Sequence, residues 1–262
     1  MRIRLAALGA LLILGASATA ASAKPLSAHG QLLRPFNANQ SNNWFGYNQG
    51  SLELGGKLFN SISGNWTVPT ASQHTGGQAE SSSDWIGIGG GCVDANCMVG
   101  DNTLIQTGTE QDVDASGKAS YGAWWEIIPG PSINISSFTV SPGDQMHADI
   151  TEAVANSNVW KITLTDVTKG KTFTQTVPYS SSHATAEWIE ETPLLIGTNA
   201  GLASLPNLSN TPFSNAKTNG AAAGLTSAEE MQLVDANGKV IGTPSAPTGG
   251  TAFTACAWAT TC

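Results

Sequence analysis

The sequence has few basic residues. Its 262 residues contain 11 Lys and Arg against 19 Asp and Glu, which gives a formal net charge of −8 at neutral pH. Nucleic acids and anionic membranes are bound by basic surfaces, so neither is an expected partner. Few cations also limit the positive self-repulsion that builds up when carboxylates protonate, and this would help the fold to survive acid.

Apolar runs of membrane-spanning length are also missing. The one long run, residues 5–15, follows Arg2 and Arg4, precedes the small-x-small pattern of 21–23, and is too short for a membrane span. This arrangement predicts a secretory signal peptide over residues 1–23. Its removal would leave 239 residues with a net charge of −10. We therefore expect a secreted protein, extracellular or, in a Gram-negative cell, periplasmic, without membrane contact once the signal is removed.

Cysteine is rare, and the four cysteines bear on the compartment and on metal binding. They are Cys92, Cys97, Cys256 and Cys262. An even count in an exported chain predicts disulfides with three possible connectivities, and the spacing favours two local loops, 92–97 and 256–262. A zinc site is the alternative. The oxidising compartment and the absence of the usual C-x2-C spacing count against it.

Amphipathic helix patterns are nearly absent. The best candidate, residues 221–234, is weakened by Gly224 and Thr226. From residue 43 onward, short runs rich in Trp, Ile, Val and Thr are broken by turn residues at the spacing typical of a β-sandwich or barrel. We expect one antiparallel β-sandwich domain over residues 43–262.

Several connecting segments can also be predicted from their composition. Lys169-Gly170-Lys171 and Asn237-Gly238 predict hairpin turns between alternating strands. The stretch 205–224, rich in Ser, Asn and Gly, predicts a long surface loop. Residues 24–42 lack periodicity and are expected to form a linker or a short pro-segment.

Common catalytic and metal-binding motifs are missing as well. The sequence contains neither G-x-S-x-G nor H-E-x-x-H, and the glycine-rich run at 86–91 is not followed by a helix that could bind phosphate. The histidines have no metal-ligand spacing and are expected at the surface or in loops: His29, His74, His147 and His183. No cofactor or metal is expected.

Three polar residues lie within otherwise apolar strands. Gln106 follows Leu104 by two positions in "LIQTG", Glu126 shares a face with Trp124, and Glu187 lies in "TAEWIEETP". Singly, each is more often a surface residue. Together they suggest a curved sheet with a polar, Trp-lined groove on its concave face. The neighbouring carboxylates at positions 190 and 191 are expected to be rim or structural groups.

These residues leave three functions open. A peptidase would use Glu187 to activate water and the Gln106 amide to stabilise the oxyanion. A glycoside hydrolase would use Glu126 and Glu187 as its two carboxylates. In a non-enzymatic sugar-binding module, Glu187 would be a ligand contact or a surface residue. Only the peptidase requires Gln106, and the residues alone do not decide among the three.

A set of short motifs, in order along residues 43 to 258, resembles the eqolisins, the glutamic peptidases. The motifs are "NNWFGY" at 42–47, "SGNWTVP" at 63–69, "DWIGIGG" at 84–90, "LIQTG" at 104–108, "YGAWWEIIPGP" at 121–131, "AEWIEE" at 186–191 and "GTAFTACAW" at 250–258. Each motif is weak alone, but their joint order is specific. The resemblance implies a sandwich of two large antiparallel sheets, concanavalin- or jelly-roll-like, whose concave face forms the cleft.

The resemblance also implies an activity and its residues. The family cleaves peptide bonds in acid with a Gln/Glu dyad, which falls on Gln106 and Glu187. Trp44, Trp85 and Glu126 match positions that line or buttress the cleft. Protein or peptide substrates are the implied partners, no metal or covalent intermediate is required, and nothing demands more than a monomer.

The chain departs from the family pattern at one position of interest. An aspartate commonly follows the W-x-G-I run in the fungal enzymes, whereas this chain has Gly89 there. Asp84 and Asp101 are the candidates that could supply the missing outer hydrogen bond.

Overall fold

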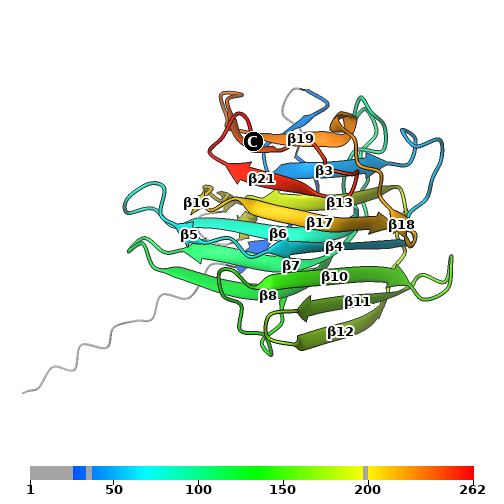
Figure 1. Ribbon diagram of the computed structural model, residues 1–262, viewed down its shortest axis with the longest axis horizontal. Coiled ribbons are helices and arrows are strands. Elements are labelled where there is room, and N and C mark those ends of the chain that lie inside the picture. The colour runs from blue at the N-terminus through cyan, green and yellow to red at the C-terminus, as the bar shows by residue number, and fades with distance from the viewer. Residues whose placement is uncertain (1–25, 34–36, 197–199) are drawn as a thin grey trace, which may run out of the picture.

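The computed structural model describes residues 26–33, 37–196 and 200–262 (Figure 1). The predicted signal peptide, residues 1–23, lies outside these ranges and stays a prediction. The described residues form β-strands joined by turns, with one short 3-10 helix, η1 (Ser227–Glu229). No helix in the described ranges is long and apolar enough to cross a membrane. The all-β expectation is therefore confirmed.

The first sheet is antiparallel and has the strand order β3-β13-β6-β7-β8-β9. Its strands are β3 (Trp44–Gly50), β13 (Thr185–Glu191), β6 (Glu80–Gly89), β7 (Leu104–Val113), β8 (Ala119–Ile127) and β9 (Ile133–Asn134).

The second sheet continues from the first and has the order β12-β11-β10-β4-β17-β21-β20-β19. Its strands are β12 (Lys171–Pro178), β11 (Val159–Asp166), β10 (Gln145–Glu152), β4 (Ser61–Thr67), β17 (Thr211–Thr218), β21 (Phe253–Ala257), β20 (Val240–Pro244) and β19 (Glu230–Val234). Strand β19 pairs with both β20 and β3, so it joins the two sheets along one edge.

Short strands flank the two sheets. β2 (Gln40–Ser41) pairs with β19, and β18 (Ala221–Ala222) pairs with β17. Two small sheets complete the described fold. One contains β1 (Leu26–Ala28), β14 (Leu194–Ile196) and β15 (Gly201–Leu202), and the other contains β5 (Ala71–Ser72) and β16 (Asn207–Leu208).

The two sheets stack as a sandwich, and buried tryptophans connect them. In Figure 1 the second sheet lies in front of the first, and β4 contacts β6 across the interior. The indole of Trp188 on β13 donates to the Ser63 carbonyl on β4 at 3.0 Å. The indole of Trp66 on β4 donates to the Thr109 hydroxyl on β7 at 2.9 Å. Each indole N–H thus finds a partner on the opposite sheet, as buried tryptophan requires.

The predicted hairpins are confirmed, while two other local predictions are wrong. Strands β11 and β12, and strands β19 and β20, pair antiparallel across the predicted turns. The stretch 205–224 is not a loop, because it contains β17, whose Thr211 and Phe213 are buried in the second sheet. Its Pro and Asn residues hide that alternation in the sequence. The helix candidate 221–234 contains β18, the short η1 and then β19.

Candidate functional site

The two predicted dyad residues lie in one straight row across the first sheet. Strand register pairs Glu126 with Gln106, Gln106 with Gly87, Gly87 with Glu187, and Glu187 with Asn48. Side chains at directly paired positions share a face of a sheet. Gln106 and Glu187 are therefore on the same side, two strand spacings or about 10 Å apart at the backbone.

Gly87 is the residue between them, and it has no side chain to fill the row. A Cβ at this position would lie 2.9 Å from the Trp85 ring, 3.1 Å from Leu104 Cδ1 and 3.3 Å from Gln106 Cβ. The close approach of these neighbours requires glycine here. The row itself therefore contributes no side chain between the Gln106 amide and the Glu187 carboxyl, and the Trp85 ring and the Leu104 side chain lie over Gly87.

The side-chain face of the first sheet that carries Gln106 and Glu187 is called the site face below. The next row along it pairs Trp124, Gly108, Trp85 and Ile189. Trp44 lies two rows beyond the dyad row and meets Trp85 edge to face, with ring centroids 4.9 Å apart. All five residues predicted for the site therefore share this face: Gln106, Glu187, Trp44, Trp85 and Glu126.

Glu187 is a buried carboxyl with little polar support. It is 0 % exposed, and no donor among the described residues meets hydrogen-bond geometry toward either oxygen. Burial raises its pKa well above the ordinary value for glutamate; the nearby Thr185 hydroxyl opposes the rise, and the Asp101 charge adds to it. A buried carboxylate without donors is costly, so burial favours the protonated form of Glu187 over the ionised form.

Gln106 is tied to Glu126 on the neighbouring strand. Its amide Nε2 donates to Glu126 Oε2 at 3.2 Å and to the His29 carbonyl at 2.5 Å. Burial raises the pKa of Glu126 to about 8, and the donors from His29 and Gln106 hold it lower than burial alone would. Glu126 thus orients the amide that faces Glu187 across Gly87.

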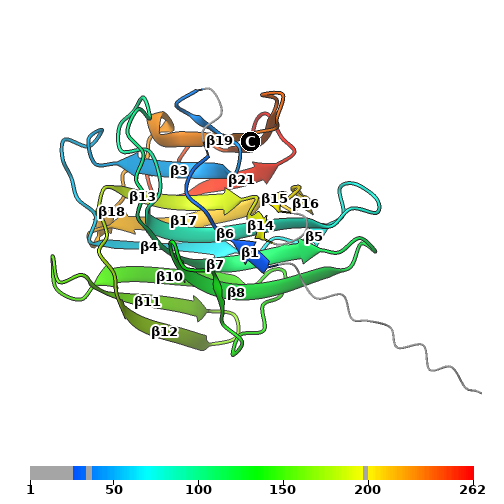
Figure 2. The ribbon, with the colours of Figure 1, turned by 180° about the vertical axis from the view of Figure 1, so that it is seen from behind.

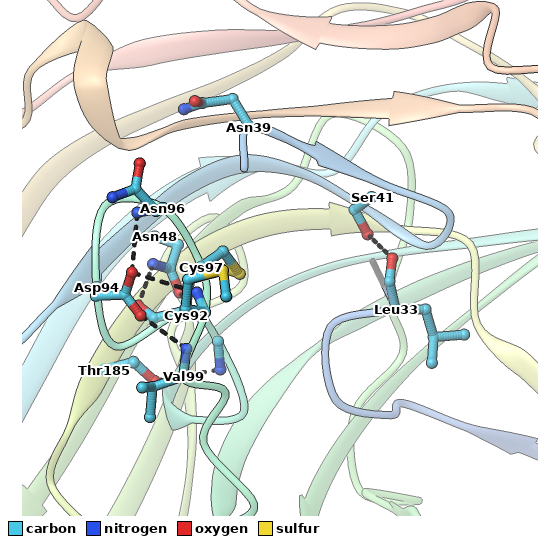
Figure 3. The surroundings of a disulfide bond; sticks show 12 residues. Leu33, Asn39, Ser41, Asn48, Cys92, Asp94, Asn96, Cys97, Val99 and Thr185 are labelled. Carbon is cyan, nitrogen blue, oxygen red and sulfur yellow. Dashed lines mark hydrogen bonds between the residues drawn. A yellow bond between two sulfur atoms is a disulfide. The ribbon is translucent and has the colours of Figure 1, made fainter. Parts of the chain in front are cut away.

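A disulfide-closed loop lies beside Asn48, the residue at one end of the row (Figure 3). Cys92 and Cys97 are bonded, and Asp94 inside this loop accepts the backbone N–H groups of residues 96, 98 and 99. Asn48 holds the loop to β3, because its amide donates to the Cys92 carbonyl at 2.9 Å and accepts from the Cys92 N–H at 3.0 Å. The loop is therefore anchored to the same row as Glu187.

Neither candidate for the missing outer hydrogen bond bonds to the dyad. Asp84 lies on the opposite face, between the sheets, where Gln111 donates to it at 2.6 Å. It is the cross-strand neighbour of Glu190, and burial and that second carboxyl raise its pKa well above normal. Asp101 accepts from Thr103 and Ser182 instead.

The second predicted disulfide, Cys256–Cys262, is also formed, far along the chain at β21. Two disulfides are typical of proteins in oxidising compartments. Within the described ranges, no group of three or more His, Cys, Asp or Glu is placed to hold a metal ion.

Comparison with known proteins decides the family. The model of the peptidase A4 family matches residues 42–257. The chain belongs to the peptidase A4 family. This match confirms the eqolisin resemblance, because it spans the motifs on which that resemblance rests.

One curated relative and two solved structures illustrate the likeness to other proteins of this family. Scytalidopepsin B of Scytalidium lignicola is 31% identical over 148 residues, which are 55% of this chain and 51% of that protein. The chain thus aligns with about half the length of this curated relative. Scytalido-glutamic peptidase with a transition state analog inhibitor has a TM-score of 0.61 at 20% identity, covering 82% of this chain and 98% of the other. SCP-B, an eqolisin in a complex with the tripeptide Ala-Ile-His, has a TM-score of 0.55 at 19% identity, with the same coverages. At these identities the structures establish the shared fold, a β-sandwich.

In this A4-family chain, alternation along β13 predicts that Glu191 shares the face of Glu187, in a rim or structural role, and the structure places it on the site face. It is not at the rim: Glu191 is 0 % exposed and accepts the Trp85 indole N–H at 2.9 Å and the Asn43 amide at 3.5 Å. Burial and then the charge of Glu126 raise its pKa well above normal. The burial of Glu191 and its bond to Trp85 are what the sequence did not predict.

The other missed residues belong to the N-terminal segment and its contact. His29, expected at the surface or in a loop, is 0 % exposed and stacks on Trp124 with ring centroids 3.6 Å apart. Figure 2 shows the blue N-terminal chain crossing the front of the first sheet, which explains why the site face is buried. No periodic pattern could predict this packing, because the segment has no core of its own.

Proposed function

We propose that this chain is an exported endopeptidase that hydrolyses peptide bonds in acid, with Glu187 and Gln106 as its catalytic pair. One observation carries the proposal: the carboxyl and the amide occupy one row of the sheet with only Gly87 between them. Membership of the peptidase A4 family supports it. The predicted signal peptide and the two disulfides support export.

The chemistry follows from the two side chains. Glu187 takes a proton from water as the water attacks the substrate carbonyl, and returns it to the leaving amine. The Gln106 amide N–H helps position the water and donates to the oxyanion that forms on the carbonyl. Glu126 fixes the orientation of that amide, because its Oε2 accepts a hydrogen bond from Gln106 Nε2 at 3.2 Å. Trp44 and Trp85 form an apolar floor beside the reacting atoms. Neither a metal nor a covalent intermediate takes part in these steps.

The acid range follows from the state of Glu187. A general base must be ionised, and burial keeps the pKa of Glu187 well above normal. Uncovering the face would restore solvent and return the pKa toward its ordinary value of about 4.3. The uncovered enzyme would then have its base ready in mild acid, while the covered form would hold Glu187 protonated.

The alternative of a glycoside hydrolase is not favoured. Its two carboxylates, Glu126 and Glu187, are three strand spacings apart in the row, or about 14 Å at the backbone. The Gln106 amide, hydrogen-bonded to Glu126, lies between them. The family match also favours peptide substrates over sugars, both for hydrolysis and for binding.

The test is cleavage of a denatured protein at acid pH, with pepstatin and a chelator present. We expect wild type to cleave, Gln106→Ala to lose about 10²–10³-fold in kcat, and Glu187→Gln to lose 10²-fold or more. Glu190→Gln is the matched control, because Glu190 lies on the same strand, is equally buried and faces the other way. Circular dichroism checks that each variant folds. Full activity in either dyad variant, or no cleavage by wild type, would refute the proposal.

A further inference from the structure

We propose that an apolar groove beyond the end of the site face is an exosite, a substrate-binding surface outside the catalytic cleft. It binds an apolar side chain of the substrate polypeptide at a distance from the cleaved bond, and Trp258 is its anchoring residue. The statement rests on the proposed function. It adds to that function a second binding surface and a preference for long, unfolded chains.

The groove has a volume of about 740 Å³, and its apolar lining comes from segments far apart in the sequence: Leu33, Leu202, Leu205, Val234, Ile241 and Trp258. Three of these large side chains, those of Leu33, Leu202 and Trp258, are 45, 40 and 39 % exposed. Single exposed apolar residues are ordinary on protein surfaces. Several that gather around one hollow are typical of a binding site.

Trp258 is held rigidly at the groove. Its ring stacks on His74, with centroids 3.6 Å apart and planes 5° apart, and its indole N–H donates to the Pro206 carbonyl at 3.0 Å. Its backbone N–H donates to the Ile241 carbonyl at 2.6 Å. The His74 ring is fixed in turn, because its Nδ1 lies 2.8 Å from Asn207 Oδ1. A ring already ordered in the free protein loses little conformational entropy when a ligand packs on it, so Trp258 is preorganised for binding.

The backbone of Trp258 also points to a binding role. Its φ is 56°, in the left-handed region that bulky residues avoid. Strained conformations of this kind are concentrated at functional sites. Six of the eight tryptophans of the chain are fully buried, whereas this one is strained and keeps its ring at the surface. The strain therefore serves the placement of an exposed ring and not the packing of the core.

The groove begins where the site face ends. Thr192, at the groove, directly follows Glu191 on the site face. Asn42, also at the groove, precedes Asn43, whose amide donates to Glu191 at 3.5 Å. Thr192 is five residues beyond Glu187, or about 17 Å along an extended strand. A substrate that extends from Glu187 toward Thr192 therefore reaches the groove about five residues from the cleaved bond.

The charge at the groove fits a cationic chain. Asp235 is the charged residue among the described groove residues. The backbone N–H groups of Lys239 and Asn237 donate to its carboxylate at 2.9 and 2.8 Å and lower its pKa. Asp235 thus stays ionised further into the acid range than an ordinary aspartate. Substrate carboxyls are neutralised in acid while lysine and arginine keep their charge, so the occupant we expect has a basic residue beside its apolar one.

An exosite at this distance has a distinct kinetic signature. Contacts about 17 Å from the reacting atoms are the same in the bound substrate and in the transition state, so they lower KM without changing kcat. A hexapeptide cut at its centre extends only about 10 Å to either side. It cannot reach the groove, and it therefore serves as the control substrate.

The experiment compares a denatured protein with a hexapeptide taken from around one of its cleavage sites, both in acid. Trp258→Ala should raise KM for the denatured protein about tenfold and Leu202→Ser about threefold, with kcat within about twofold and hexapeptide cleavage unchanged. Leu58→Ser is the matched control and should change neither substrate. Leu58 is also an exposed leucine, but Phe59 beside it bonds to the His183 carbonyl, at the opposite end of β13 from the groove. Circular dichroism checks that each variant folds.

A second measurement uses the tripeptide acetyl-Leu-Leu-Lys-amide as a competitor. It should raise KM for the denatured protein with wild type but not with Trp258→Ala, and it should leave hexapeptide cleavage unchanged. Inhibition of both substrates would place the tripeptide on the site face and overturn the exosite.

Other results also separate this inference from the proposed function. If Trp258→Ala leaves KM for the denatured protein unchanged, or raises KM equally for both substrates, the exosite is refuted and the proposed function stands. Dimers of wild type that Trp258→Ala abolishes would assign the groove to a second copy of the chain and likewise overturn the exosite. If wild type cleaves neither substrate, the proposed function itself fails.

Discussion

The raised pKa of Glu126 predicts that the fold loses stability as the pH rises from acid to neutral. Its folded pKa of about 8 stands against a value of 4.5 in the unfolded chain. Between these values the unfolded state has released the proton while the folded state retains it, so the free energy of unfolding falls as the pH rises. The difference of about 3.5 pKa units corresponds to at most about 5 kcal/mol.

Replacing this carboxyl with an amide should remove that contribution. Glu126→Gln cannot ionise, and its side chain keeps an oxygen that can accept from His29 and Gln106. Both proteins should carry Glu187→Gln as well, so that neither can cleave itself during the measurement. The segment that covers Glu126 then stays in place, and Glu126 stays buried. The stability difference between them should then change by about 1.4 kcal/mol per pH unit between the two pKa values.

Urea unfolding followed by tryptophan fluorescence at about pH 4.5, 5.5, 6.5 and 7.5 measures this difference by linear extrapolation. We expect the protein with Glu126 to lose stability more steeply than the protein with Gln at this position. The buried carboxyls that Glu126 does not influence, such as Asp84 and Glu190, give both proteins a common slope that cancels in the comparison. Parallel curves, within about 0.5 kcal/mol across the range, would refute the burial argument for Glu126.

Three further variants test other features of the structure. Gly87→Ala places a Cβ 2.9 Å from the Trp85 ring. By displacing the side chains around position 87, it should lower kcat/KM about 10²-fold; unchanged kinetics would contradict the need for glycine between Gln106 and Glu187. Gly91→Ala places a Cβ 1.7 Å from Asn48 Oδ1 and 2.7 Å from Glu187 Oε1, and should cost about 1–3 kcal/mol in urea unfolding; wild-type stability would show that the loop can move aside at no cost. Replacing both cysteines of the 256–262 bridge with alanine should cost about 2 kcal/mol with kcat retained, and a loss of activity without a loss of stability would contradict its distance from the site.

Local pattern was enough to predict the type of fold and the direction of the two dyad side chains. Alternation along 185–191 put Glu187 opposite Trp188, and the structure places Trp188 between the sheets. Alternation cannot tell which strands become neighbours. The pairing of Gln106, Gly87 and Glu187 is a contact between segments remote in sequence, and here the family motifs, not periodicity, linked the two residues.

The burial of Glu191 and that of His29 share one physical cause. Both are buried by contact between the site face and a segment that crosses it, and the segment shows no periodic pattern for that contact. Around His29 the segment is held by bonds between side chains and single backbone groups, as between Gln106 and His29. Such bonds depend on the completed sheet, so they leave no trace in the local sequence.

The row from Glu126 to Asn48 has a consequence for heat inactivation. Its side chains are spaced by the same backbone ladder that holds β8, β7, β6, β13 and β3 together. No loop motion can separate Gln106 from Glu187; only unpairing central strands can, and such strands open with the whole domain. Loss of activity on heating should therefore coincide with global unfolding. Reversible control of such an enzyme has to come from a segment or a molecule that covers the site face, because the sheet itself does not rearrange.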